Sequence, residues 1–456
     1  RSSGIDLREC AGTPEEAARA LGLKPRALAE SLTEARRVLE VCVGARLEAY
    51  DDQGATVASA TLDLSDVATH ERLRFRLALA LRSMTTGAPV ELAIASDRPL
   101  LSPAEAVLDY QNQGHFAPGG ADPYGPAKEW LKAHGFTVTE VNPKEPVVPS
   151  TADALLVLQP RRDAALIHAA LFEHLNAGGR ALLAAQTHDL LGRRKSESAH
   201  AFAWWPRPLY PDVDGPFEEL GLALDPRLLF DSLHASSLIP TRVDRSGLTP
   251  KTELRSSNAP FCVRVLGRDG LGDVTFAGAN SLAADTAQLR ARELELTPWL
   301  SASPDAWSYA WEGGDLTDSA LSGASSDPLS EARPSALLAA DLTGSFPGAK
   351  VLEDGSLALT PAAQGSSGRL CLLSSSAPLR AAHLHHADSD NAQLLLLAAS
   401  RLTLEPALTQ LLTQRETPVG FEPLPARERL LWRLFLLGGA PLLIAGVGLR
   451  RARRSA

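Results

Sequence analysis

Aromatic residues, cysteine and methionine are scarce in this chain of 456 residues. Phe, Trp and Tyr together make up 5% of the sequence, which disfavours a groove that binds sugars or nucleobases by stacking. The four cysteines, at positions 10, 42, 262 and 371, show no C-x-x-C spacing and no histidine at metal-ligand spacing. Met84 is the one methionine, so we expect residues to be missing ahead of Arg1, with a signal peptide or membrane helix among them.

Phosphate-binding and nucleophile motifs are also missing. The sequence has no G-x-G-x-x-G, no Walker loop and no G-x-S-x-G elbow, so we expect no bound cofactor and no ATP hydrolysis by this chain alone. Gly178-Gly179 follows a predicted helix and precedes a predicted strand, which is typical of a helix C-cap. The formal net charge of -9, with no basic stripe in the body of the chain, disfavours a nucleic-acid surface.

The stretch from Asp122 to Asp189 carries the clearest fold signal. Its pattern predicts a helix ended by Gly135, a strand over 136–141 and an almost wholly apolar strand over 154–158. Arg162 to Asn176 then repeats apolar residues at helical spacing, and 180–185 returns as a strand. This αβαβ succession predicts an α/β fold with a doubly wound sheet.

The rest of the chain divides into further predicted parts. Residues 1–100 read as a smaller N-terminal α/β unit, with a helix over 27–39 and a hairpin over 41–62. The α/β core follows over 101–311, and a Gly/Ser-rich segment over 312–332 is predicted to be a flexible loop. Residues 333–427 complete the α/β body, before a transmembrane helix over 428–450 and a basic cytoplasmic tail over 451–456.

The segment from Leu430 to Leu449 has the length and apolar character of a membrane span. Its interfacial residues, its proline, the small residues that allow close helix packing and the flanking arginines form the predicted anchor: Trp432, Arg433, Gly438, Gly439, Pro441, Gly446, Arg450, Arg451, Arg453 and Arg454. Because positive charges favour the cytoplasmic side, the tail is predicted to be cytoplasmic and the body to lie across the membrane from it.

Two polar loops at predicted strand ends are candidates for chemistry. His188 and Asp189 form a weak candidate for a catalytic base with its orienting carboxylate, and Ser374, Ser375 and Ser376 are the serines placed to supply a nucleophile. The loop around His383, His385, His386 and Asp388 is a weak candidate for a transition-metal site. Asp388 and Asp390 also precede a predicted helix, where N-cap residues belong, and this role is favoured over a metal.

The order of these parts resembles the GldG-type auxiliary proteins of ABC transport systems, first named for gliding motility. The resemblance rests on WLKAHGFTVTEVN, PVVPSTADALLVLQPR, LNAGGRALLAA, DSDNAQLLLLAASRLTL and the terminal GLRRARR, in that order. It implies a flavodoxin- or amidotransferase-like domain without a catalytic residue set, and a membrane helix before the body as well as after it. It also implies an ABC ATPase and a multi-span permease as partners, in the bacterial inner membrane with the body on the periplasmic side.

These observations favour a non-catalytic, membrane-anchored accessory subunit that acts by recognising a protein or substrate, alone or within a homo- or hetero-oligomer. A membrane-anchored hydrolase or amidotransferase-like enzyme that uses His188 and Asp189 is the alternative from a different class. A scaffold protein without a transport role is a third possibility. The sequence does not indicate which substrate is transported.

Overall fold

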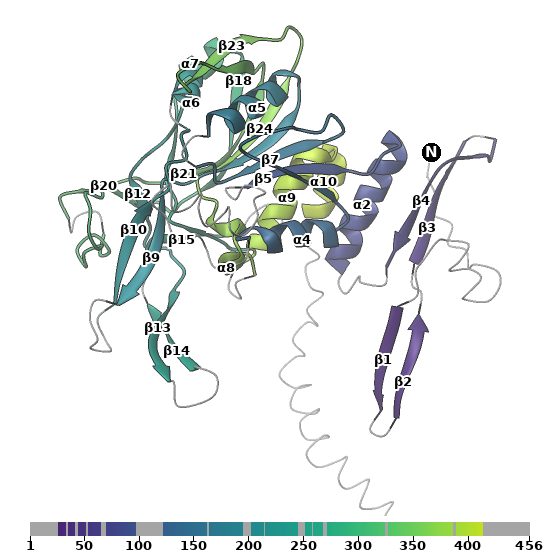
Figure 1. The fold of residues 1–456 in the computed structure, drawn as a ribbon, viewed down its shortest axis with the longest axis horizontal. Helices are drawn as coiled ribbons and strands as arrows, with labels where there is room; N and C mark the ends of the chain where they lie inside the picture. Colours follow the sequence, from purple (N-terminus) through teal and green to yellow (C-terminus); the bar gives the residue numbers. More distant parts are fainter. Residues whose placement is uncertain are drawn as a thin grey trace, which may run out of the picture. The chain divides into compact units, whose positions relative to one another are not determined.

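The computed structural model describes residues 26–32, 35–41, 44–51, 53–64, 70–96, 122–161, 164–194, 202–213, 215–244, 251–257, 259–267, 271–323, 327–385 and 389–413. These residues form a mixed α/β structure in which a large central sheet is accompanied by smaller antiparallel sheets (Figure 1).

Five neighbouring strands of the central sheet are parallel, in the spatial order β6-β5-β7-β8-β24. Their bounds are Glu91–Ser96 (β5), Thr137–Val141 (β6), Ala154–Leu158 (β7), Arg180–Ala184 (β8) and Gly368–Leu373 (β24). Antiparallel strands extend the sheet beyond β24: β21 (Leu337–Gly344), β18 (Leu294–Ser301), β17 (Leu282–Ala284) and β11 (Leu222–Leu224). The doubly wound part predicted from 122–189 is therefore present, and a long insertion separates β8 from β24.

Helices cover both faces of the sheet, which explains why β7 is apolar at every position and β5, β8 and β24 at most positions. Leu156 and Leu182 pack on one face with the helices α2 (His70–Thr86), α4 (Gly125–Ala133), α9 (Asn391–Thr403) and α10 (Pro406–Thr413). Leu155 and Leu183 pack on the other face with α5 (Ala165–Asn176) and α6 (Pro216–Leu220) (Figure 1). Burying one leucine side chain contributes about 1.5–3 kcal/mol, so these two apolar layers dominate the stability of the sheet.

Helix α5 ends where its sequence requires. The Gly178 N–H donates to Leu175 O and the Gly179 N–H to His174 O, and Gly178 has φ 82°, a conformation that costs other residues energy. The prediction of a C-cap at Gly178-Gly179 is confirmed.

The insertion between β8 and β24 contributes small antiparallel sheets with an aromatic core of their own, which includes Trp204, Phe230, Phe261, Trp307 and Tyr309. Its strands are β9 (His188–Arg194), β10 (Phe202–Pro208), β12 (Leu228–Phe230), β13 (Ser237–Asp244), β14 (Lys251–Ser257), β15 (Cys262–Val265), β16 (Val274–Ala277), β19 (Trp307–Tyr309), β20 (Ser330–Ala332), β22 (Pro347–Val351) and β23 (Leu357–Ala362). The short helices α7 (Thr286–Ala291), η1 (Ala377–Leu379) and α8 (Ala381–Leu384) complete the elements.

One N-terminal prediction is confirmed and another is wrong. The predicted hairpin is formed by β3 (Gly44–Tyr50) and β4 (Thr56–Asp63). The helix predicted over 27–39 is instead the antiparallel pair β1 (Arg26–Leu32) and β2 (Ala35–Val41). Helical spacing is a weak signal in so short a segment, and cross-strand pairing satisfies the same backbone groups.

The central sheet contains strands from both sides of residue 100, where the sequence predicted a division between two domains. Strand β5 lies before that position, yet it pairs with β6 on one side and β7 on the other. The predicted transmembrane helix and basic tail, with all the anchor residues, lie outside the described residues. Among the helices that the structure describes, none is long and apolar enough to span a bilayer.

Candidate functional site

The carboxyl ends of β7, β8 and β24 meet at one edge of the sheet, because these strands are parallel neighbours. This is the edge at which open α/β sheets bind ligands. Polar residues follow each strand within two positions: Gln159 after β7, Gln186 to Asp189 after β8, and Ser374 to Ser376 after β24. Residues 97–121, which follow β5, lie outside the described residues.

Two glutamines and two serines at this edge form a glutamine–serine network, defined as Gln159, Gln186, Ser375 and Ser376. All four are fully buried. Gln186 Oε1 accepts from Ser375 Oγ at 2.7 Å, from the Ser376 N–H at 3.1 Å and from the Ala377 N–H at 3.1 Å. Gln159 Oε1 accepts from Ser376 Oγ at 2.8 Å and from the Gln186 N–H at 3.1 Å. Hydrogen bonds thus join three strand ends that are distant in sequence.

Gln159 holds this position with a strained backbone. Its φ is 53°, in the left-handed region that residues with a side chain rarely adopt. Its N–H donates to Ala184 O at 2.7 Å, and its side-chain Nε2 donates to Gln186 O at 3.0 Å. These bonds fix the turn after β7 against the end of β8 and offset the cost of the conformation.

An arginine–aspartate cluster, defined as Asp189, Arg207, Arg380 and Arg161, lies at the same edge. Arg207 Nη2 donates to Asp189 Oδ2 at 2.8 Å, and Arg380 Nη1 lies 3.0 Å from Asp189 Oδ1. Arg207 and Asp189 face each other across the β9–β10 hairpin, whereas Arg380 follows η1. Arg380 Nε also donates to the Tyr124 hydroxyl at 3.2 Å, so α4, η1 and the hairpin meet at this cluster.

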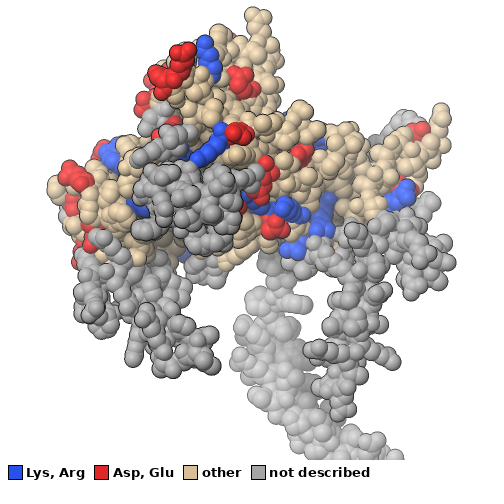
Figure 2. All heavy atoms as spheres, in the orientation of Figure 1, with Lys and Arg blue, Asp and Glu red and all other residues tan. Residues whose placement is uncertain are grey.

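The charges of the cluster determine the protonation state of Asp189. Although burial acts to raise the pKa of the Asp189 carboxyl, the guanidinium groups of Arg380 and Arg207 outweigh it and hold that pKa below its usual range. Arg161 acts in the same direction. Asp189 is therefore a carboxylate at neutral pH. Elsewhere on the surface, Figure 2 shows basic and acidic side chains interspersed among the residues drawn in colour.

His188 and Asp189 do not form the pair considered from the sequence. They are consecutive in strand β9, so their side chains leave opposite faces. The His188 Nδ1 lies 2.9 Å from Thr187 Oγ1, and its ring packs edge-on against Trp311. Burial lowers the pKa of His188 to about 4. A neutral imidazole results, with the Asp189 carboxylate occupied by arginines.

The three serines considered as nucleophiles are fully buried. Ser375 and Ser376 belong to the glutamine–serine network, and the hydroxyl of Ser374 has no hydrogen-bond partner within the described part of the chain. The arrangement couples two of these serines to glutamine amides, which are not bases.

The metal candidate is described only in part. His386 and Asp388 lie outside the described residues, while His385 packs against the Trp130 ring and His383 O accepts from Asn391 Nδ2. No group of three or more potential metal ligands is present in the described ranges. Helix α9 begins at Asn391, as predicted, and Asp390 is at its N-cap position without a side-chain capping bond.

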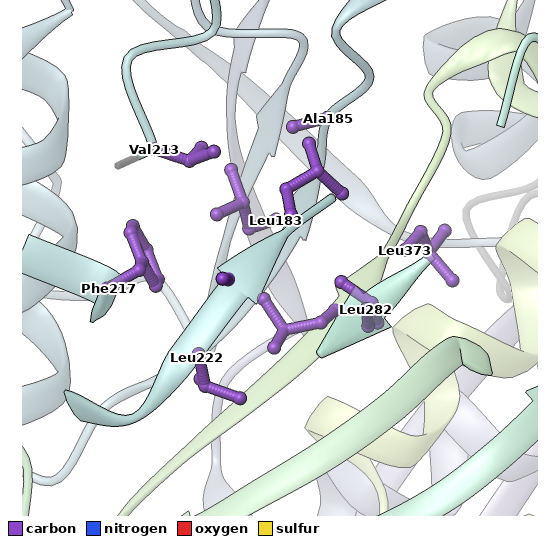
Figure 3. Close-up of a pocket in the computed structure, with 10 residues that line it drawn as sticks. Leu183, Ala185, Val213, Phe217, Leu222, Leu282 and Leu373 are labelled. Atoms are coloured by element: carbon purple, nitrogen blue, oxygen red, sulfur yellow. The ribbon is translucent and has the colours of Figure 1, made fainter. Parts of the chain in front are cut away.

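Hollows lie near both edges of the sheet. An apolar cavity of about 30 Å³ lies beside the ends of β8 and β24, where Figure 3 shows Leu183, Phe217 and Leu222 around it. It has room for about one water molecule and offers no polar partner, so it is a packing gap. A groove of about 680 Å³ lies at the opposite, amino edge of the sheet, lined in part by Arg82, Asp153, His174 and Arg180.

Sequence reasoning missed most members of the carboxyl-edge site. It singled out the stretch from Gln186 to Asp189 and the three serines, but not Gln159, Arg207, Arg380 or Tyr124. One signal was available for Gln159, since it directly follows a buried strand. No local sequence pattern singles out Arg380, because the residue that it contacts, Asp189, is distant in the sequence. Comparison with protein-family models and with curated protein sequences finds no match to this chain.

Proposed function

We propose that this chain is a non-catalytic, membrane-anchored accessory subunit of an ABC-type transport complex, whose extracytoplasmic body acts by recognition. The resemblance to GldG-type proteins supplies the ABC ATPase and permease as partners, and the basic-tailed apolar segment over 430–449 supplies the anchor. The body is a flavodoxin-like domain in this proposal. Numbered in chain order, its parallel strands run 2-1-3-4-5, the order of flavodoxin-type sheets.

The glutamine–serine network is the observation that carries the non-catalytic part of the proposal. A catalytic serine needs a base within hydrogen-bond reach and access to substrate. Ser375 and Ser376 are buried and bind amide oxygens, and Asp189 binds arginines. These polar groups join strand ends into a rigid edge, which suits a surface that must keep its shape while it binds a partner.

Purification of the tagged full chain from membranes in mild detergent tests the transport part. We expect an ABC ATPase and a multi-span permease to copurify, and the isolated chain to hydrolyse no ATP. Gly438→Leu with Gly439→Leu should reduce recovery of the permease, because close helix packing needs small residues. Leu443→Val in the same segment is the matched control. Repeated recovery of the chain alone contradicts the transport assignment.

Protease treatment of intact spheroplasts tests the orientation. We expect cleavage of the body and protection of an epitope placed after Ala456, because the arginine-rich tail is predicted to be cytoplasmic. Protection of the body with loss of the epitope contradicts the predicted topology. An activity-based serine probe gives an independent check, since labelling of Ser374, Ser375 or Ser376 contradicts a non-catalytic body.

A further inference from the structure

Arg207 has more hydrogen-bonding capacity than its ion pair with Asp189 uses. It gives one terminal nitrogen to Asp189, and a guanidinium has five N–H donors. Arg380 adds a second positive charge, and its nitrogens bind Asp189, the Tyr124 hydroxyl and the Ser376 hydroxyl. The Nε of Arg207 is buried and has no acceptor within the described residues. A buried donor without a partner is rare and costly in native structures, and a bound group that supplies an acceptor would remove that cost.

The cluster is also open to solvent in part. The exposed fractions of the side chains are 28% for Arg207, 19% for Asp189 and 14% for Arg380. A pair serving only to lock the hairpin to the sheet needs no third guanidinium, yet Arg161 follows β7 closely enough to act on Asp189. Three guanidinium groups therefore act on one carboxylate at a partly open position.

Strained backbone conformations occur in the segments around the arginine–aspartate cluster. Gln159 has φ 53° at the end of β7, and Tyr210 and Asp212, in the segment after β10, have φ 50° and 51°. The Leu209 N–H donates to Thr187 O, which ties that segment to the end of β8. Residues other than glycine adopt the left-handed backbone conformation where the surrounding structure enforces it, and such residues are concentrated at binding sites.

We propose that Arg207 and Arg380, assisted by Arg161, bind the carboxylate or phosphate group of a small anionic solute at the carboxyl edge of the sheet. Arginine suits this ligand class because its planar fork matches two oxygens of a carboxylate or phosphate. Asp189 binds one terminal nitrogen of each guanidinium and therefore competes with the anion for them. This inference rests on the recognition role proposed above and names the chemistry that is recognised.

Calorimetric titration of the purified full chain with inorganic phosphate, and separately with citrate, tests the proposal. We expect saturable binding of at least one anion, and the tighter of the two identifies the phosphate or the carboxylate class. Arg207→Gln and Arg380→Gln should each weaken binding about tenfold or more, because each removes charge-assisted hydrogen bonds. Arg264→Gln, which removes an arginine paired with Asp273 and not with Asp189, is the matched control and should bind as the parent chain does.

Asp189→Asn separates anion binding from a purely structural ion pair. The variant should bind the anion more tightly than the parent chain, because a negative charge that repels the ligand is gone. This variant keeps the proposal testable if Arg207→Gln fails to fold. The absence of saturable binding by both anions, or equal binding by the parent, Arg207→Gln and Arg264→Gln, overturns the proposal.

Copurification distinguishes failure of this inference from failure of the proposed function. If neither anion binds but the ATPase and permease still copurify, the anion site is wrong and the accessory role stands. If an anion binds through Arg207 but neither subunit is recovered, the site stands and the transport assignment is wrong.

Discussion

The two edges of the central sheet each have two arginines that bind one aspartate, Asp341 at the amino edge and Asp189 at the carboxyl edge, but the amino-edge arginines also bind a helix terminus. At the amino edge, three arginines donate to consecutive carbonyl oxygens at the end of α9: Arg369 to Arg401 O, Arg180 to Leu402 O and Arg82 to Thr403 O. At the carboxyl edge, Arg207 and Arg380 bind the Asp189 carboxylate. The amino-edge set completes a helix terminus, whose carbonyls lack partners and carry partial negative charge.

The difference shows how to separate structural arginines from candidate binding ones. The amino-edge groove, of about 680 Å³, is larger than the apolar cavity of about 30 Å³ beside β8 and β24, yet its charged lining is bound to the protein itself. Arg180 donates to Leu402 O, and the His174 ring nitrogen lies 3.1 Å from Arg180 O. The carboxyl edge instead presents a partly open cluster, in which the Asp189 side chain is 19% exposed, whereas Asp341, which binds Arg369 and Arg401 at the amino edge, is 4% exposed. The size of a hollow is therefore a poorer guide here than the partners of its polar groups.

Gln186→Leu should have the largest effect on stability, because it breaks the carboxyl edge. The substitution leaves the buried N–H group of Ser376 without an acceptor. It also removes one of two acceptors from the Ser375 hydroxyl and from the Ala377 N–H, which keep Ala277 O and Ser375 Oγ respectively. An unsatisfied buried group costs about 1–3 kcal/mol and each lost hydrogen bond about 1 kcal/mol, so we expect the free energy of unfolding to fall by roughly 4 kcal/mol. Urea denaturation followed by circular dichroism measures the change.

Gln288→Leu is the matched control for that substitution. Gln288 Nε2 donates to Glu218 O and Glu219 O in an exposed region, so its loss should cost about 1 kcal/mol. Equal losses for the two variants would mean that the glutamine–serine network contributes no more than an exposed hydrogen bond.

Two histidines of α5 allow a pH test of the same contrast. His168 is buried, and its Nε2 lies 3.1 Å from Pro211 O, whereas the half-buried His174 lies beside the amino edge. Burial lowers the pKa of His168 to about 4 and also lowers the pKa of His174. Between pH 6.5 and pH 4 the unfolded chain binds a proton at His168 that the folded chain does not, so stability falls as the pH falls.

His168→Gln should therefore reduce the loss of stability on acidification. A folded pKa of about 4 against 6.5 in the unfolded chain corresponds to about 3 kcal/mol lost between pH 7 and pH 4 at this position. His174→Gln should reduce the loss by less, since His174 is less buried. Denaturation at several pH values gives both slopes, and a slope unchanged by His168→Gln contradicts a neutral buried histidine.

The regular elements around β7, β8 and α5 were predictable because their signals are local. An uninterrupted apolar run over 154–158 forms a covered strand, and apolar spacing up to Asn176 followed by Gly178 forms a capped helix. The prediction of a helix over 27–39 was wrong, because the apolar spacing of this segment fits a helix while its backbone pairs as two antiparallel strands. Local pattern decides such a case only when it is long or has clear caps.

The candidate site was less predictable because its contacts join distant positions. Asp189 and Arg207 lie opposite each other only after the register of the β9–β10 hairpin is known, and Arg380 comes from beyond the insertion. The pairing of His188 with Asp189 fails for a local reason that a strand assignment would have revealed. Consecutive residues of a strand point to opposite faces and cannot orient one another.

Arg180→Met should have the smallest effect and tests the amino-edge arginines. Methionine keeps much of the apolar stem but removes the donor that lies 2.8 Å from Leu402 O. Because Arg82 and Arg369 still bind the neighbouring carbonyls, we expect a loss of about 1 kcal/mol and faster amide exchange in α10, which follows α9. Arg292→Met, at an exposed position after α7, should change neither quantity.

Anion binding by Arg180→Met should equal that of the parent chain, since the Arg180 guanidinium lies at the amino edge and the proposed anion site at the carboxyl edge. Weakened anion binding in this variant would mean that the two edges are not independent.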